Sequence, residues 1–145
     1  MNLFFGFSGR MGRAGWWFCQ LVCTVMAVTA VALLAQEHGL EFSDAWAERK
    51  VLVSGLQESP WVVGLVLLGA CINLASTVKR FHDMNKSGAW ILAWILINIV
   101  SSLAHFDGIR FLGGIWILIE CGFLAGTPGA NSYGDPVGAT PSIAY

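Results

Sequence analysis

Four apolar runs alternate with polar connections along the chain. They cover residues 15–35, 60–78, 89–104 and 109–125. A helix needs about 20 residues, within a range of about 17–25, to cross a bilayer. The first two runs meet this length, and the two shorter runs are typical of a helical hairpin. The pattern therefore predicts an all-α polytopic membrane protein with about four transmembrane helices, forming a single membrane domain over residues 1–145.

The first run also resembles a signal peptide, because basic residues precede it. It is longer than a usual signal-peptide apolar region and continues through Leu33 and Leu34. We therefore expect a retained helix.

The connections differ in charge. Cytoplasmic loops of membrane proteins carry an excess of Lys and Arg. Five of the eight basic residues lie in the N-terminal segment and in the second connection: Arg10, Arg13, Lys79, Arg80 and Lys86. We therefore predict cytoplasmic N- and C-termini, an outer loop at 36–59, a cytoplasmic loop at 79–88 and a cytoplasmic tail at 126–145. Within the outer loop, Ser43 and Gly55 are suited to begin and end a short surface helix, with an irregular loop as the alternative.

Composition supports a membrane protein. The chain is 56% hydrophobic and 12% charged, whereas soluble domains average about 25% charged residues. Its net charge of -1 argues against nucleic-acid binding, which needs a basic face. Cys19, Cys23, Cys71 and Cys121 all lie in apolar runs, so neither a disulfide framework nor a metal site is predicted. We predict no cofactor.

The second connection concentrates polar chemistry between two apolar runs. Ser87 is placed to cap the third helix, and Lys86 lies beside the positive end of that helix. The segment is therefore a candidate site for an anionic lipid headgroup. The alternative is that its cations only orient the protein and that Asp83 neutralises one of them. His82 and Asp83 are adjacent, so on a helix their side chains would point apart, and we predict no catalytic residue.

Glu120 lies inside the fourth apolar run, about 9 Å from its cytoplasmic end at 1.5 Å per residue. An ionised carboxylate at this depth is costly, so we expect it to face the bundle interior or a wet cavity. Arg10, Arg13 or Arg80 are its expected partners. Both a structural ion pair and a role in handling protons or solutes agree with this position.

Three motifs span most of the chain. The first is Gly9-Arg10-x-x-Arg13 followed by Trp17, and the second is Arg80-Phe81-His82-Asp83 followed by Ser87-Gly88 and Trp90. The third is Gly129-x-Asn131-x-Tyr133-Gly134-Asp135-Pro136. In order and spacing they resemble domain-of-unknown-function family 805. The chain departs from that family at Ala89, where a second aromatic residue is common, and at Ser132, where a basic residue is common.

The resemblance implies a multi-pass protein of the bacterial plasma (inner) membrane and implies no activity. With the predicted topology, all three motifs lie on the cytoplasmic face. The turn at 131–136 is rich in residues that favour turns, and we expect it to fold back against the second connection. The predicted binding residues are Arg10, Arg13, Arg80, His82, Asp83, Lys86, Ser87, Glu120, Asn131 and Asp135.

Three functions compete on this evidence. The first is a binding or scaffold protein, with membrane lipids, above all anionic phospholipid, or a partner helix at the cytoplasmic face. The second is an oligomeric transporter or channel component that uses Glu120. The third is a membrane enzyme that uses His82 and Asp83, and it lacks a recognisable nucleophile or metal set. Expected protein partners are further copies of the chain or another membrane protein.

Overall fold

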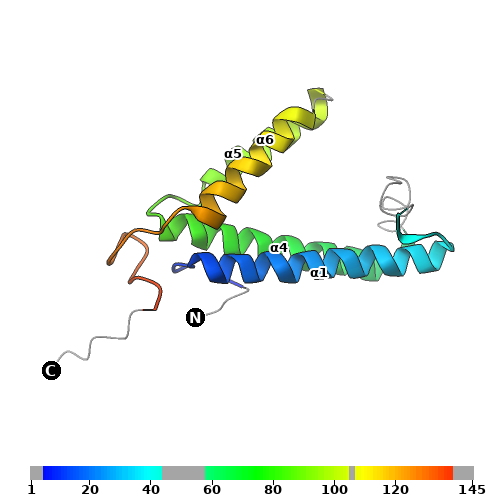
Figure 1. Ribbon diagram of the computed structural model, residues 1–145, viewed down its shortest axis with the longest axis horizontal. Helices are drawn as coiled ribbons and strands as arrows, with labels where there is room; N and C mark the ends of the chain where they lie inside the picture. Colours follow the sequence, from blue (N-terminus) through cyan, green and yellow to red (C-terminus); the bar gives the residue numbers. More distant parts are fainter. Residues whose placement is uncertain (1–4, 44–57, 105–106, 139–145) are drawn as a thin grey trace. The chain divides into compact units, whose positions relative to one another are not determined.

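The computed structural model describes residues 5–43, 58–104 and 107–138. All regular elements in these residues are helical, in agreement with the predicted all-α class (Figure 1). The elements in chain order are α1 (Arg13–His38), α4 (Pro60–Asp83), α5 (Trp90–Ala104), α6 (Asp107–Ile117) and the π-helix η1 (Leu118–Phe123). Most of the outer loop (44–57), part of the turn between the last two predicted runs (105–106) and the end of the tail (139–145) lie outside the described residues.

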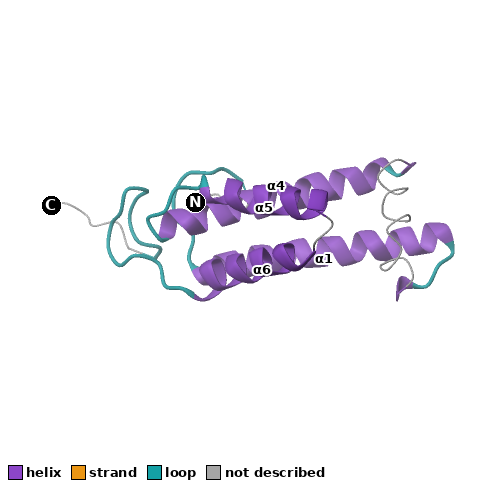
Figure 2. Ribbon diagram, turned by 90° about the horizontal axis from the view of Figure 1, so that it is seen from above, coloured by secondary structure: helices purple, strands orange, loops and turns teal. Residues whose placement is uncertain are grey.

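The helices form two compact units. The middle unit is Cys19–Asn73, and the terminal unit combines Met1–Phe18 with Leu74–Tyr145. Within the middle unit, the segments of α1 and α4 lie side by side and run in opposite directions (Figures 1 and 2). A small apolar core in the middle unit joins the C-terminal half of α1 to the start of α4; its buried members are Val31, Leu34, Ala35 and Val62.

Helix α4 continues five residues beyond the apolar run predicted to end at 78, so the first half of the predicted loop at 79–88 is helical. It ends in a Schellman motif. The Lys86 N–H donates to the Phe81 carbonyl at 2.9 Å, and the Asn85 N–H donates to the His82 carbonyl at 3.0 Å. Asn85 has φ 57°, a conformation that Asn tolerates better than most residues. Hydropathy marks where apolar side chains stop, whereas this cap decides where the backbone leaves the helix.

The last two predicted runs form the antiparallel pair α5 and α6. Gly113 of α6 faces α5 closely, because an added Cβ there would lie 3.0 Å from Ile97 Cγ2. The predicted single helix over 109–125 is in fact two segments, since α6 ends at Ile117 and a π-helix follows to Phe123. The wider π turn buries Glu120, Cys121 and Gly122, and π segments are frequent at functional sites.

Among the helices of the described residues, α1 and α4 are long and apolar enough to cross a membrane, judged by length and composition. On α5, the side chains of Leu92, Leu96 and Leu103 are 62%, 59% and 76% exposed. Their spacing of four and seven residues places them on one helix face. An apolar face of this kind suits contact with lipid or with a partner rather than with water.

Candidate functional site

Two arginines and one aspartate form a buried cluster in the terminal unit. Arg10 Nε donates to Asp83 Oδ1 at 3.0 Å, and Arg80 Nη1 donates to Asp83 Oδ2 at 2.5 Å. All three residues are at most 5% exposed. Burying charges is tolerated when they are paired and hydrogen-bonded. Asp83 therefore does neutralise a neighbouring cation, as one alternative for the second connection expected, and it does so for two cations at once.

Arg10 connects the N-terminal segment to the tail. Its Nη1 donates to the carbonyl of Gly129 at 2.6 Å and to that of Gly134 at 3.3 Å, and its Nη2 donates to the carbonyl of Thr127 at 2.6 Å. The Thr127 N–H in turn donates to the Asp83 carbonyl at 2.8 Å. The guanidinium of Arg10 therefore holds the tail over 127–134 by donating to three of its backbone carbonyls.

Side chains from α1 and α4 satisfy the free carbonyls at the end of η1. The last carbonyls of a helix have no partner within it. Arg80 donates to the carbonyls of Cys121 (2.7 Å) and Leu124. Trp17 Nε1 donates to the Gly122 carbonyl at 3.1 Å. Cations are also favourable at this negative end of the helix.

The carboxylate of Glu120 pairs with the Lys86 ammonium. The expectation that Arg10, Arg13 or Arg80 would reach Glu120 is wrong. The guanidiniums of Arg10 and Arg80 bind Asp83 and backbone carbonyls instead, and that of Arg13 donates to the Phe123 carbonyl. Lys86 is therefore not a free cation beside the third helix, and Glu120 is a buried, paired carboxylate.

The predicted turn lies against the end of α4. Asn131 Nδ2 donates to the His82 carbonyl at 2.9 Å, and the Tyr133 ring stacks on the His82 ring with centroids 3.9 Å apart. His82 Nδ1 lies 3.2 Å from the Gly9 carbonyl. His82 thus faces Tyr133 and Gly9, whereas the Asp83 side chain faces two arginines. The two adjacent side chains do not form a pair that could share a proton.

The remaining predicted residues occupy separate places. The Ser87 hydroxyl accepts from the Ala89 N–H at 3.2 Å, next to the first turn of α5. Arg13 is exposed, and its Nη1 donates to the Phe123 carbonyl at 3.3 Å. Asp135 is also exposed, and its carboxylate makes no hydrogen bond or ion pair with any described residue. Among described residues, no three His, Cys, Asp or Glu side chains are placed to hold a metal ion.

A cleft of about 490 Å³ opens beside the buried cluster. Arg10, Arg13, Arg80 and Asp83 are its charged lining residues. Three guanidiniums and one carboxylate leave it with two positive charges in excess. We refer to it as the basic cleft.

The N-terminus of α1 opens into the basic cleft. The first bond within the helix runs from the Trp16 N–H to the Gly12 carbonyl at 3.1 Å. The first three N–H groups of α1 therefore have no acceptor within the helix. They belong to Arg13, Ala14 and Gly15, and none of them donates to an acceptor in the described part of the chain. Gly12, Arg13 and Ala14 also line the cleft. Free N–H groups and the helix dipole both favour an anion at such a position.

Several residues of this region were not among the binding residues predicted from the sequence. Gly126 faces Asp83, and Trp16 Nε1 donates to Thr77 Oγ1 at 3.3 Å. Thr127 Oγ1 accepts from Asn131 Nδ2 at 2.8 Å. A glycine or threonine in a polar tail carries no local signal, so these contacts emerge only from the folded chain.

Comparison with known proteins identifies the family. The family described as "Protein of unknown function (DUF805)" matches residues 4–135. The chain belongs to this family. It is 30% identical over 132 residues to inner membrane protein YhaI of Escherichia coli (strain K12), covering 90% of this chain and 84% of that protein. It is 29% identical over 143 residues to uncharacterized protein YiiR of the same strain, with the same coverage. No solved structure matches the chain.

Membership of the DUF805 family confirms the resemblance inferred from the three motifs. In this member each motif contributes residues to the contacts described above. The first motif contributes Arg10, the second contributes Arg80 and Asp83, and the third contributes Asn131 and Tyr133. Their side chains meet at one end of the terminal unit through the contacts described above.

Proposed function

We propose that this DUF805 protein is a multi-pass protein of the bacterial inner membrane, with four spans and both termini in the cytoplasm, and that its basic cleft binds the phosphate of an acidic phospholipid headgroup. The long apolar helices α1 and α4, the apolar face of α5 and the name of the relative YhaI support the membrane assignment. The asymmetric placement of Lys and Arg supports the orientation.

One observation above all supports the headgroup site. An uncapped helix N-terminus and an excess of positive charge occur together in the basic cleft. The first residues of α1 and the Arg13 side chain line the same cleft as Arg10 and Arg80. A phosphate there would accept hydrogen bonds from backbone N–H groups and from a guanidinium. Hydrogen bonds of this charge-assisted kind are the stronger ones in proteins.

Arg13 is the residue best suited to report on binding. Arg10 and Arg80 are buried and hold the tail and η1 in place, so replacing either would disturb the fold. Arg13 is exposed and makes one described hydrogen bond, at 3.3 Å. It can therefore turn toward a ligand at little structural cost.

Replacing Arg13 with Gln is expected to reduce the acidic phospholipid retained by the purified protein about tenfold, since a hydrogen bond to a charged group contributes about 1.5–3 kcal/mol and 1.4 kcal/mol is tenfold. Native mass spectrometry of protein from nanodiscs containing equal phosphatidylglycerol and phosphatidylcholine measures this. Added inorganic phosphate should displace the lipid if the phosphate group alone is recognised, and should leave it bound if the whole headgroup is required.

Arg110→Gln is the matched control, because it removes the same charge from an exposed residue of α6 that does not line the cleft. It should retain lipid like the wild type. Equal lipid in Arg13→Gln and in the control would refute the headgroup site, and equal loss in both would indicate a general effect of net charge.

The topology has its own test. A green fluorescent protein fused to the C-terminus should fluoresce, and alkaline phosphatase fused there should be inactive, because the first folds in the cytoplasm and the second requires the oxidising periplasm. Alkaline phosphatase inserted at the outer loop, 36–59, should be active. The opposite pattern at either position would contradict the proposed orientation.

A further inference from the structure

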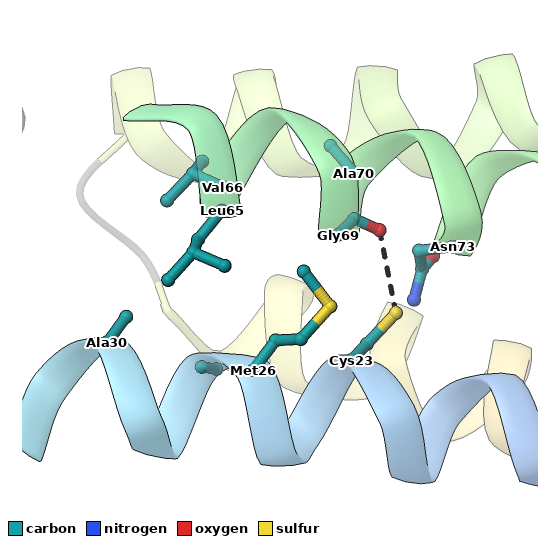
Figure 3. A pocket seen from close by; sticks show the side chains of 9 residues that line it. Cys23, Met26, Ala30, Leu65, Val66, Gly69, Ala70 and Asn73 are labelled. Atoms are coloured by element: carbon teal, nitrogen blue, oxygen red, sulfur yellow. Dashed lines mark hydrogen bonds between the residues drawn. The ribbon is translucent and has the colours of Figure 1, made fainter. Parts of the chain in front are cut away.

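Polar groups on the lining of the middle-unit cavity are already hydrogen-bonded. This cavity of about 320 Å³ lies between α1 and α4. Figure 3 shows the Cys23 thiol directed at the Gly69 carbonyl, to which it donates at 3.5 Å. Asn73 Nδ2 donates to Gln20 Oε1 at 2.9 Å, and the other side chains of the lining are apolar. Donors that lack an acceptor occur instead in the basic cleft of the terminal unit.

Two arginines of the basic cleft keep N–H groups without acceptors. A guanidinium has five N–H donors. Arg80, which is 0% exposed, uses three of the five on Asp83 and on two backbone carbonyls, so two stay buried with no acceptor in the described part of the chain. Among described residues, Arg13 uses one, on the Phe123 carbonyl. A buried donor without an acceptor is costly, and the oxygens of a bound anion would supply the missing acceptors.

The charge of the basic cleft matches a dianion. Its three guanidiniums and one carboxylate leave two positive charges in excess. A phosphate monoester carries a charge of about −1.5 to −2 at pH 7, because its second pKa is about 6, and it has three strong acceptor oxygens. A phosphodiester, such as the headgroup of phosphatidylglycerol, carries a single charge and has one unesterified oxygen fewer. The monoester therefore fits both the charge and the donors better.

The rest of the lining suits a bare phosphate better than a phosphate that carries a polar headgroup. Both carboxylate oxygens of Asp83 accept from arginines. The Thr127 hydroxyl donates to the Asp83 carbonyl at 2.9 Å and already accepts one hydrogen bond. The remaining side chains of the lining are apolar and belong to Ala14, Pro136 and Val137. A glycerol or ethanolamine group on the phosphate would find no free carboxylate among these side chains.

Exposed aromatic side chains adjoin the basic cleft. Arg13, which lines the cleft, donates to the Phe123 carbonyl at 3.3 Å. Trp17 lies one turn after Arg13 on the same face of α1, and its ring meets the Phe123 ring edge to face, with centroids 6.0 Å apart. Trp17 and Phe123 are 42% and 60% exposed. An exposed apolar surface beside an anion site suits the acyl chains of a lipid.

We infer that the basic cleft selects lipids whose headgroup is a bare phosphate monoester, such as phosphatidic acid, over phosphodiester lipids. This inference rests on the headgroup site proposed above and specifies its ligand. The terminal phosphate accepts hydrogen bonds from the first N–H groups of α1, from Arg13 and from Arg80. The acyl chains lie over Trp17 and Phe123.

The test compares dioleoyl phosphatidic acid with dioleoyl phosphatidylglycerol. Both are present in equal amounts in phosphatidylcholine nanodiscs that hold the full-length protein, and native mass spectrometry measures the ratio in which they are retained. At about pH 8 the wild type should retain about tenfold more phosphatidic acid, because one additional hydrogen bond to a charged group is sufficient for a factor of ten. Arg13→Gln should lower this ratio toward one, and Arg110→Gln should leave it unchanged.

The ratio should also depend on pH. At about pH 5 the monoester has lost its second charge, so the ratio should fall severalfold. The ionisable groups that line the cleft are Arg10, Arg13, Arg80 and Asp83, and the arginines keep their charge throughout. A change in the charge of the protein acts on both lipids, whereas the second ionisation belongs to phosphatidic acid alone.

Glycerol 3-phosphate separates a lipid from a soluble ligand, because it has the same phosphate and no acyl chains. It should displace phosphatidic acid only in about tenfold excess or more. Displacement at equal concentrations would overturn the lipid assignment and identify a soluble phosphate monoester as the ligand.

The two proposals fail in different ways. Equal retention of both lipids by the wild type, with both reduced in Arg13→Gln, would overturn the selectivity and leave the headgroup site standing. A ratio that is the same at both pH values would also overturn it, because the second charge is then not recognised. Retention of neither lipid would overturn the selectivity and the headgroup site together.

Discussion

Replacing Asp83 with Asn is expected to lower the free energy of unfolding by about 3–5 kcal/mol, the usual cost of removing one partner from a buried ion pair. Asn keeps the shape of the side chain and removes its charge. The guanidiniums of Arg10 and Arg80, which are 4% and 0% exposed, would then share a buried site without a counter-charge. The N-terminal segment, the end of α4 and the tail all meet at this carboxylate, so their packing should be lost together.

Asp135→Asn is the matched control, since it makes the same chemical change at an exposed residue. Surface substitutions of this kind usually stay within about 0.5 kcal/mol. Thermal unfolding of both variants in the same mild detergent, followed by tryptophan fluorescence, measures the difference. If Asp83→Asn melts with the control, the buried cluster does not stabilise the fold.

Replacing Gly126 with Ala is expected to destabilise the protein by about 2 kcal/mol or more, within the range for overpacked sites. A Cβ at this position would lie 2.0 Å from Asp83 Oδ2 and 2.6 Å from Asp83 Cγ. A free carboxylate would simply rotate away. This one is bonded to two arginines, so either the ion pairs or the start of the tail must move.

Gly114→Ala provides the comparison. Gly114 lies on an exposed face of α6, and an added Cβ meets nothing within 4 Å. Ala within a helix is favoured over Gly by about 0.5–1 kcal/mol, so this variant should be slightly more stable than the wild type. The same melting experiment compares the two. Similar stabilities for Gly126→Ala and Gly114→Ala would mean that the tail does not pack on Asp83.

The structural roles of Arg10 and Arg80 also decide which residue of the basic cleft should be replaced in the lipid-binding test. Arg10 and Arg80 contribute positive charge to the cleft. Most of their N–H groups, however, already donate to Asp83 and to backbone carbonyls. Loss of lipid in an Arg80 variant would therefore report damage to η1 as readily as loss of a ligand contact. Arg13 avoids this ambiguity because it is exposed.

Much of the helical organisation follows from the sequence alone. The apolar runs at 15–35 and 60–78 lie within α1 and α4 because long apolar stretches favour helices that satisfy their own backbone. The run at 89–104 corresponds to α5 within one residue. The π-helix within the fourth run was not predictable, because a single wider turn changes no hydrophobic period. The end of α4 at Asp83 depends on the cap at Asn85, which hydropathy does not report.

For the polar residues, too, the sequence indicated some contacts and the tertiary structure decided the others. Sequence motifs indicated that Asn131 and His82 belong to one region, and turn-forming residues made a folded-back tail plausible. Only the tertiary structure decided that Lys86, and not an arginine, pairs with Glu120, and that Asp83 serves two arginines. These partners are separated by 34 residues for Lys86 and Glu120 and by 73 for Arg10 and Asp83. Which of several cations reaches a carboxylate depends on helix rotation and on the path of the tail, and neither is encoded in local periodicity.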